Sequence, residues 1–172
     1  EPENIKENYR RLKECMGFTQ IITPKQEHTD NIIVIDENTD LTKTYRADAF
    51  VTAQKNIAIG VFSADCTPVL MYDEEKKVIA AVHSGWRGTA NKIAAKAAKI
   101  MKEQFFCNDI CVAIGPAIGG CCFEIGEDVK EILEHTHPDC IDLIQRFGKK
   151  FKADTKAIIK AEMQKEGITK FD

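Results

Sequence analysis

The amino-acid sequence predicts a mixed α+β fold in a single domain, in which layered mixed β-sheets are flanked by helices. Short apolar runs typical of strands and longer amphipathic runs typical of helices follow one another, without the strict alternation of a doubly wound sheet. The 172 residues are enough for one domain with a sizeable core, and 44% hydrophobic and 30% charged residues are usual for a globular protein. We therefore treat residues 1–172 as one domain.

The first third of the chain predicts one helix followed by strands. Residues 1–18 carry apolar side chains at helical spacing and end near Gly17, a helix terminator. These apolar side chains are Ile5, Tyr9, Leu12 and Met16. Three apolar runs then predict strands at residues 31–36, 49–53 and 56–64.

The middle of the chain predicts a hairpin, with strands at residues 68–73 and 78–83 around a charged turn. Residues 89–104 are rich in Ala and Lys and predict an amphipathic helix. Beyond it we expect a buried strand, a glycine-rich loop and two helices, at residues 109–115, 115–120, 127–135 and 154–165. The sequence ends on a glycine terminator and the start of a strand without a partner.

The charge of the chain argues against nucleic-acid and membrane partners. Its 27 acidic and 24 basic residues give a net charge of −3, so the basic stripe of a nucleic-acid-binding protein is missing. The Lys-rich residues 92–102 and 149–160 are expected to be solvated helix faces. No run approaches the ~18 consecutive apolar residues of a membrane span, and no secretory leader opens the sequence. We expect a cytoplasmic protein.

The cysteines also favour a reducing compartment. There are seven, an odd number, in a chain that is long for a disulfide scaffold. No Cys-x-x-Cys pair occurs, which argues against a zinc ribbon or a thioredoxin-like site. We expect most of them to be small buried hydrophobic residues, including Cys121 and Cys122, which would point to opposite sides of an extended segment.

The predicted hairpin places a thiol near an imidazole. Its turn is centred near residue 75, so Cys66 falls roughly opposite His83 on the facing strand. Directly paired positions have Cβ atoms about 4.5–5.5 Å apart, close enough for both side chains to bind one metal ion. Taken singly, a buried Cys or His is more often part of the packing; together they form a candidate site.

A metal site needs a third protein ligand, and His28 is the best remaining histidine because it follows a turn and precedes a strand. His135 and His137 could chelate as His-x-His, but a helix C-terminus favours histidine through its dipole, and we prefer that explanation. Two nitrogen ligands and one sulfur ligand leave a fourth position open, which is the arrangement of a catalytic zinc.

The segment after His83 predicts an anion site. Gly85 and Gly88 allow a sharp turn, and the helix expected from Thr89 would point its N-terminal N–H groups at the turn, beside Arg87. A guanidinium at that place suits phosphate. Alternatively, Arg87 pairs with a local acid such as Asp65. Trp86 belongs either to the core or to a surface on which a flat ring stacks.

Five segments, in this order, closely resemble the laccase-domain (YfiH-like) family: "KQEH", "RADAFVT", "SADCTPVL", "VHSGWRGT" and "IGPAIGGCCFEIG". Members are described as multicopper polyphenol oxidases and as purine nucleoside phosphorylases. The resemblance covers most of the chain and implies layered sheets covered by helices. It also implies three metal ligands, the His of "KQEH", the Cys of "ADC" and the His of "HSGWRG", which here are His28, Cys66 and His83. The family pattern has further segments at both ends that this sequence lacks.

The resemblance implies zinc-dependent chemistry on purine nucleosides: phosphorolysis of adenosine, inosine, guanosine or methylthioadenosine, and deamination of adenosine. The older family label implies copper-dependent phenol oxidation. Four histidines cannot supply a multicopper cluster, although one Cu²⁺ at the open site remains an alternative. We also consider a cysteine hydrolase, with Cys66 as nucleophile and His83 as base, and a non-catalytic metal-binding module.

The purine interpretation assigns roles to individual residues. Cys66, His83 and Arg87 are the expected catalytic residues, with Zn²⁺ as cofactor and phosphate as co-substrate. Phosphate held near Arg87 would attack C1′ of the ribose, while deamination would use a water of lowered pKa at the metal to attack C6 of adenine. Trp86, Phe123 or Tyr45 would stack on the base. The expected partners are nucleosides and phosphate, and the expected state is a monomer or homodimer.

Overall fold

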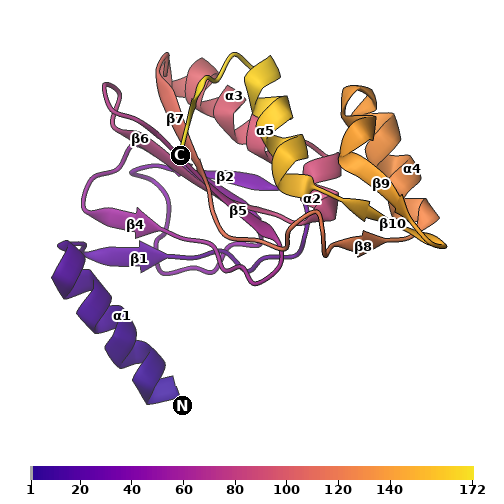
Figure 1. Ribbon diagram of the computed structural model, residues 1–172. Coiled ribbons are helices and arrows are strands. Elements are labelled where there is room, and N and C mark those ends of the chain that lie inside the picture. Colours follow the sequence, from indigo (N-terminus) through magenta and orange to yellow (C-terminus); the bar gives the residue numbers. More distant parts are fainter. Residues whose placement is uncertain (1) are drawn as a thin grey trace.

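Six apolar strands form one mixed sheet at the centre of the computed structural model, which describes residues 2–172 (Figure 1). In spatial order the strands are β11 (Lys170–Phe171), β7 (Ile110–Ile114), β5 (Thr67–Asp73), β6 (Val78–Ser84), β3 (Ala49–Thr52) and β2 (Ile32–Ile35). The two outermost pairs are parallel and the three inner pairs are antiparallel. The predicted mixed α+β class, with helices flanking the sheet in a single domain, is confirmed.

Two helices cover one face of this sheet: α3 (Ile93–Phe105) and α5 (Thr155–Lys165) (Figure 1). Side chains alternate along each strand, so Val69 and Met71 of β5 pack under the helices. The buried face of α3 is largely alanine, which lets the helix lie close to the strands. Its buried residues are Ile93, Ala94, Ala95, Ala97, Ala98 and Met101. This layer is the main core of the protein.

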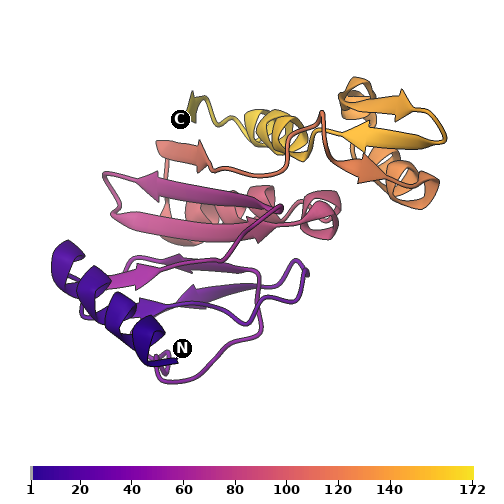
Figure 2. The same cartoon turned by 60° about the horizontal axis from the view of Figure 1, so that its bottom comes forward.

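A smaller layer covers part of the opposite face. The strands β1 (Gln20–Ile22) and β4 (Ile57–Ile59) form a parallel pair whose residues pack against β2 and β3 (Figure 2). The buried members of this cluster are Ile22, Ile35, Ala47, Phe50 and Ile57. Beyond this layer, Leu70 and Tyr72 of β5 are 52% and 48% exposed and line an apolar pocket of about 330 Å³.

A third, antiparallel sheet lies at one end of the molecule (Figure 1). It consists of β8 (Glu124–Ile125), β10 (Lys150–Ala153) and β9 (Ile144–Phe147), in that spatial order. The helix α4 (Glu127–Thr136) packs on it, followed by the 3₁₀ segment η1 (Pro138–Leu143). The short helix α2 (Trp86–Ala90) joins this unit to β6, because Ala90 packs into the same cluster as Leu133 and Phe151.

Most predicted elements are confirmed, but the helix expected at residues 89–104 is not continuous. It is divided into α2 and α3 at Lys92, which has the left-handed φ of 61°. Thr89 lies inside a turn that has already begun, because its backbone N–H and its hydroxyl both donate to the Gly85 carbonyl. The apolar residues keep their helical spacing across Lys92, so the sequence pattern does not indicate the division into α2 and α3.

Four further differences concern strands. Only residues 57–59 of the strand expected at 56–64 are extended, and the rest form a loop toward Cys66. The final strand, expected to be unpaired, is β11, and it pairs in parallel with β7. The strands β1, β8, β9 and β10 were not predicted, and the Lys-rich residues from 149 begin in the β9–β10 hairpin instead of a helix. Short polar hairpins carry too few alternating residues to be recognised.

The remaining helices fit their sequence signals. The helix α1 (Pro2–Met16) ends before Gly17, which has a φ of 74°, and α1 projects away from the sheets (Figure 1). Asp154 caps α5 by accepting the Ala157 N–H at 3.0 Å. Within residues 2–172, no helix has the length and apolar character needed to cross a bilayer.

The seven cysteines are unpaired, but they are not mostly buried as expected. Cys107 and Cys140 are buried, and Cys66 and Cys111 are half-buried. Three are exposed: Cys15, Cys121 and Cys122. Cys15 lies on the projecting helix α1, while Cys121 and Cys122 occupy a turn instead of the extended segment that the sequence suggested.

Candidate metal centre

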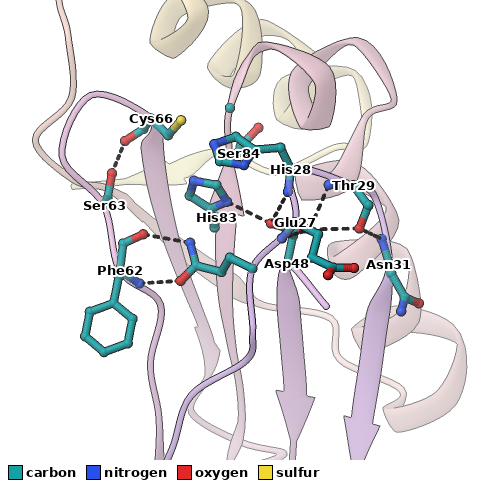
Figure 3. A network of polar contacts seen from close by, with 12 residues as sticks. Glu27, His28, Thr29, Asn31, Asp48, Phe62, Ser63, Cys66, His83 and Ser84 are labelled. Atoms are coloured by element: carbon teal, nitrogen blue, oxygen red, sulfur yellow. Dashed lines mark hydrogen bonds and ion pairs between the residues drawn. The ribbon is translucent and has the colours of Figure 1, made fainter. Parts of the chain in front are cut away.

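Three side chains from separate segments meet at one point (Figure 3). His28 lies in the loop before β2, Cys66 directly precedes β5, and His83 is in β6. One donor atom from each lies within 4.8 Å of the other two, and the two imidazole rings meet edge to face with centroids 4.8 Å apart. Two nitrogens and one sulfur in this arrangement fit a zinc ion that keeps a fourth position open.

The pairing that brings Cys66 to His83 differs from the predicted one. Pro68, two residues after Cys66, is the partner of His83. The turn is centred between residues 75 and 76, and each half-residue error in a turn centre moves every expected partner by one position. Cys66 still reaches His83 because it lies just beyond the strand end, where the chain is free to bend toward the imidazole.

Asp48 connects two of the ligands. Its side chain is fully buried, and its Oδ1 accepts from His83 Nδ1 at 2.9 Å and from the His28 backbone N–H at 3.0 Å. Its Oδ2 accepts from the Thr29 N–H at 2.7 Å and from the Thr29 hydroxyl at 2.8 Å. With Nδ1 engaged as a donor, His83 presents its Nε2 lone pair to the metal position, which is the usual orientation of a zinc-bound histidine.

The electrostatics of the site favour a cation. Burial raises the pKa of Asp48, but the N–H of Thr29 and the His83 ring outweigh it, so the pKa is lowered and the carboxylate stays charged. Burial raises the pKa of the Cys66 thiol, and the carboxylates of Asp65 and Asp48 raise it further. A divalent cation at this position reverses that effect, because a coordinated thiol loses its proton.

The loops that carry His28 and Cys66 are tied together. His28 itself has a left-handed backbone, with a φ of 58°, which aims its ring toward β6. Next to it, the Gln26 side chain donates to the Phe62 carbonyl at 2.8 Å and accepts the Phe62 N–H at 2.7 Å. This double hydrogen bond acts like one rung of a sheet and holds the loop before Cys66 beside the His28 loop.

Gly85 is required by the site for reasons of space. A Cβ atom at this position would lie 3.0 Å from Cys66 Sγ and 3.1 Å from His28 Cδ2. Both contacts are tighter than ordinary van der Waals distances, and its φ of −73° is open to any residue. The glycine therefore serves close approach of two ligands, and not the backbone freedom that the sequence suggested.

A small cavity of about 70 Å³ adjoins the thiol ligand. Trp86 and Phe123 both line it, together with Cys66 and Gly85. Trp86 thus contributes to the site instead of the core. Tyr45, the third aromatic residue considered for stacking, packs in the cluster below β2 and β3 and is not among the residues that line the cavity.

Arg87 lies beside this cavity but not in the arrangement predicted for it. Its guanidinium stacks on the Trp86 ring, 4.3 Å from the centroid, and within residues 2–172 it makes no ion pair with Asp65. The helix start expected at Thr89 is wrong, because α2 begins at Trp86 and Thr89 is buried inside it. Arg87 is exposed, so its charge is available to an anion.

The other two histidines lie elsewhere. His135 is in the last turn of α4 and His137 is its C-terminal cap, as the dipole explanation predicted. The sequence did not indicate three contributions to the candidate metal centre: the carboxylate of Asp48, the double hydrogen bond of Gln26 with Phe62, and the steric role of Gly85. An aspartate directly before a strand that begins with three apolar residues was the available signal for Asp48, because a buried carboxylate needs nearby donors.

Comparison with known protein families matches residues 1–172 to the multi-copper polyphenol oxidoreductase laccase model. The chain belongs to this family. A purine nucleoside phosphorylase from Clostridium acetobutylicum is 40% identical over 149 residues, which are 86% of this chain and 62% of that protein. Adenosine deaminase RL5, from an unknown prokaryotic organism, is 34% identical over 163 residues, 89% of this chain and 62% of that protein.

Solved structures agree with the fold. A Neisseria meningitidis protein superimposes with a TM-score of 0.86 at 28% identity, covering 99% of this chain and 69% of that one. The chain spans about 62% of the length of the two sequence relatives named above. These relatives are named for two reactions of purine nucleosides, phosphorolysis and the deamination of adenosine.

Proposed function

We propose that this laccase-family chain is a zinc-dependent purine nucleoside phosphorylase that also deaminates adenosine. The observation that carries the proposal is the convergence of His28, Cys66 and His83 beside a cavity lined by Trp86 and Phe123. The names of its relatives supply the substrate class. The expected substrates are adenosine, inosine, guanosine and methylthioadenosine.

The donor set indicates what the cofactor does. Two imidazoles and one thiolate would hold Zn²⁺ as a Lewis acid with one open position. Asp48 keeps the proton of His83 on Nδ1, so that Nε2 remains a ligand, and it fixes the His28 loop through the backbone. These two tasks make Asp48 a positioning residue.

Phosphorolysis requires that a phosphate oxygen attacks C1′ while the bond from C1′ to the purine breaks. Arg87 is the cation that would bind this phosphate, since its guanidinium is exposed and is fixed on the Trp86 ring. Aromatic faces bind flat heterocycles by stacking, so we assign the purine to Trp86 and Phe123. Oriented binding of both reactants lowers the barrier by removing the entropy cost of their encounter.

Two alternatives within the enzyme class fit less well. A multicopper oxidase needs several copper centres, and only two of the four histidines are at this site. A cysteine hydrolase would use Cys66 and His83 with Asp48 behind them. It gives His28 no task, and the raised pKa of Cys66 opposes the thiolate that such an enzyme needs.

We also propose a cytoplasmic location, because seven unpaired thiols are typical of a reducing compartment.

The proposal is tested by incubating metal-replete protein, in its full-length form, with adenosine in the presence and absence of phosphate. We expect adenine and ribose 1-phosphate only with phosphate, and inosine under both conditions, separated by chromatography. Cys66→Ala and His83→Ala should each lose zinc and turnover together. Cys15→Ala, on the exposed surface of α1, is the matched control and should lose neither. Retention of stoichiometric zinc by either site variant would contradict the proposal.

A further inference from the structure

The turn at residues 119–123 brings two thiols together outside the metal centre. Cys121 and Cys122 are both exposed, and their Sγ atoms are 3.2 Å apart, in a thiol–thiol hydrogen bond. Side chains of adjacent residues diverge in an extended strand, so this contact depends on the turn. The turn is closed by hydrogen bonds from the Cys122 and Phe123 N–H groups to the Gly119 carbonyl, at 2.8 and 3.0 Å.

The surroundings of the pair favour reaction over inert packing. Cys121 lines a surface pocket of about 440 Å³ together with Arg146 and Lys152. Asp142 and Asp154 line the same pocket, so its charges balance, and the pocket offers the exposed Cys121 sulfur to a small polar oxidant. The hydrogen bond with Cys121 raises the pKa of Cys122, and the charge of Lys152 partly opposes this. Either sulfur can donate in this contact, so the two thiols lie in position to react with each other.

We propose that Cys121 and Cys122 are an oxidation site for a hydroperoxide, which converts them into a vicinal disulfide. The Cys121 thiolate attacks one peroxide oxygen, the O–O bond breaks, and a sulfenic acid and hydroxide are formed. The Cys122 sulfur then attacks the Cys121 sulfur, the S–S bond forms, and the S–O bond breaks with loss of water. In total the two thiols give up two electrons and two protons, and hydrogen peroxide is reduced to two waters.

Such a bridge is reversible for geometric reasons. Cα atoms of adjacent residues are about 3.8 Å apart across a trans peptide, whereas ordinary disulfides need about 4.4–6.8 Å. A bridge between neighbours is therefore strained, and strained disulfides are readily reduced by cellular thiols. The pair suits a labile modification, not a structural crosslink.

Oxidation of the pair reaches the metal centre through the backbone. Closing the sulfur separation from 3.2 Å to about 2.05 Å requires the turn to change shape. Phe123 follows Cys122 directly and lines the same small cavity as Trp86 and Cys66. Upstream, the Ile118 N–H donates to the Asp65 carbonyl at 3.0 Å, next to Cys66. Both ends of the turn are therefore close to Cys66, through Phe123 on one side and the hydrogen bond of Ile118 to Asp65 on the other.

The test uses zinc-loaded protein and readouts that do not depend on nucleoside turnover. After brief exposure to hydrogen peroxide, alkylation of the unfolded chain should label two fewer of the seven cysteines, and dithiothreitol should restore both. Peptide mapping should place the loss of two hydrogens on the peptide that contains Cys121 and Cys122. Trp86 is the only tryptophan, so its emission should shift on oxidation and return on reduction.

Two variants complete the experiment. Cys122→Ser should accumulate a sulfenic acid at Cys121, trapped by dimedone, because the second sulfur is missing. Cys15→Ser removes another exposed thiol, and this variant should form the disulfide as the protein without substitutions does. The inference is overturned if Cys121 and Cys122 both remain alkylatable after peroxide, or if the Trp86 emission shifts equally in the Cys122→Ser variant. These outcomes leave the proposed nucleoside chemistry unaffected.

Discussion

Replacing Asp48 by asparagine tests whether its carboxylate positions the candidate metal ligands in addition to stabilising the fold. The carboxylate of Asp48 accepts from His83 and His28 on Oδ1, and from the two donors of Thr29 and, at 3.3 Å, the Glu27 N–H on Oδ2. In Asp48→Asn one oxygen becomes an NH₂ group that faces these donors. The His83 ring or the Thr29 hydroxyl can then accept from it, so one or two backbone N–H groups lose their acceptor. At about 1–3 kcal/mol for each buried unpaired group, we expect a loss of about 1–6 kcal/mol in the free energy of unfolding.

The effect on the metal follows from the histidine tautomer. Where the new NH₂ group faces His83, the ring must accept at Nδ1 and carry its proton on Nε2, which then cannot bind zinc. Loss of a carboxylate partner behind a metal-bound histidine typically costs about 10–100-fold in metal affinity. We therefore expect zinc binding to weaken by about that factor, measured by competition with a chromophoric chelator under conditions where the variant is folded.

Asp73→Asn is the matched control. Asp73 is equally buried and accepts three backbone N–H groups, from Lys76, Asn108 and Asp109, at 2.8–3.0 Å. Its replacement should lower the unfolding free energy by a comparable amount, measured by urea denaturation, without changing zinc affinity. Equal zinc affinities for Asp48→Asn and Asp73→Asn would show that the Asp48 carboxylate does not position the ligands.

Three further predictions address the site. Gly85→Ala places a Cβ about 3 Å from Cys66 Sγ and His28 Cδ2 and should weaken zinc binding about 10-fold in the same chelator assay, with urea stability nearly unchanged. Folding lowers the pKa of Asp48, so its contribution to the free energy of unfolding is complete above the unfolded pKa of 3.8 and is lost as the pH falls through the lower folded pKa. In Asp48→Asn, the free energy of unfolding should therefore fall less steeply with decreasing pH below 3.8. Arg87→Ala should raise the KM for phosphate about 10-fold or more, because a charged contact with phosphate is lost. The rate of adenosine deamination should change by less than about 2-fold. Equal losses in both reactions would contradict the assignment of phosphate to Arg87.

The elements with long, regular apolar patterns could be predicted from the sequence. The strands β2, β3, β5, β6 and β7 and the helices α1, α4 and α5 lie where the spacing of apolar residues indicates. The division at Lys92 could not be predicted, because the apolar spacing continues across it, whereas the left-handed backbone of Lys92 separates the two helices.

The three candidate metal ligands could be named from the sequence for a different reason. Cys66 and His83 flank a short hairpin, and a short turn constrains which residues can meet, so an error of two positions in register still left them neighbours. His28 is distant in sequence and was chosen by elimination and by family resemblance. No residue close to His28 in the sequence links it to β6. The link is the carboxylate of Asp48, which accepts from both the His28 N–H and the His83 ring.

The sequence by itself determined the class of fold and most of its elements, since these depend on local periodicity. Side-chain chemistry, together with the family resemblance, pointed to the three residues that meet at the candidate metal site. Only the tertiary structure decided how the donors are held, because Asp48, Gln26 and Gly85 act through long-range hydrogen bonds and close approach. The same holds for the two thiols at residues 121 and 122. Their neighbourhood in the sequence is evident, but only the turn brings the sulfur atoms into contact, because side-chain direction follows from backbone conformation.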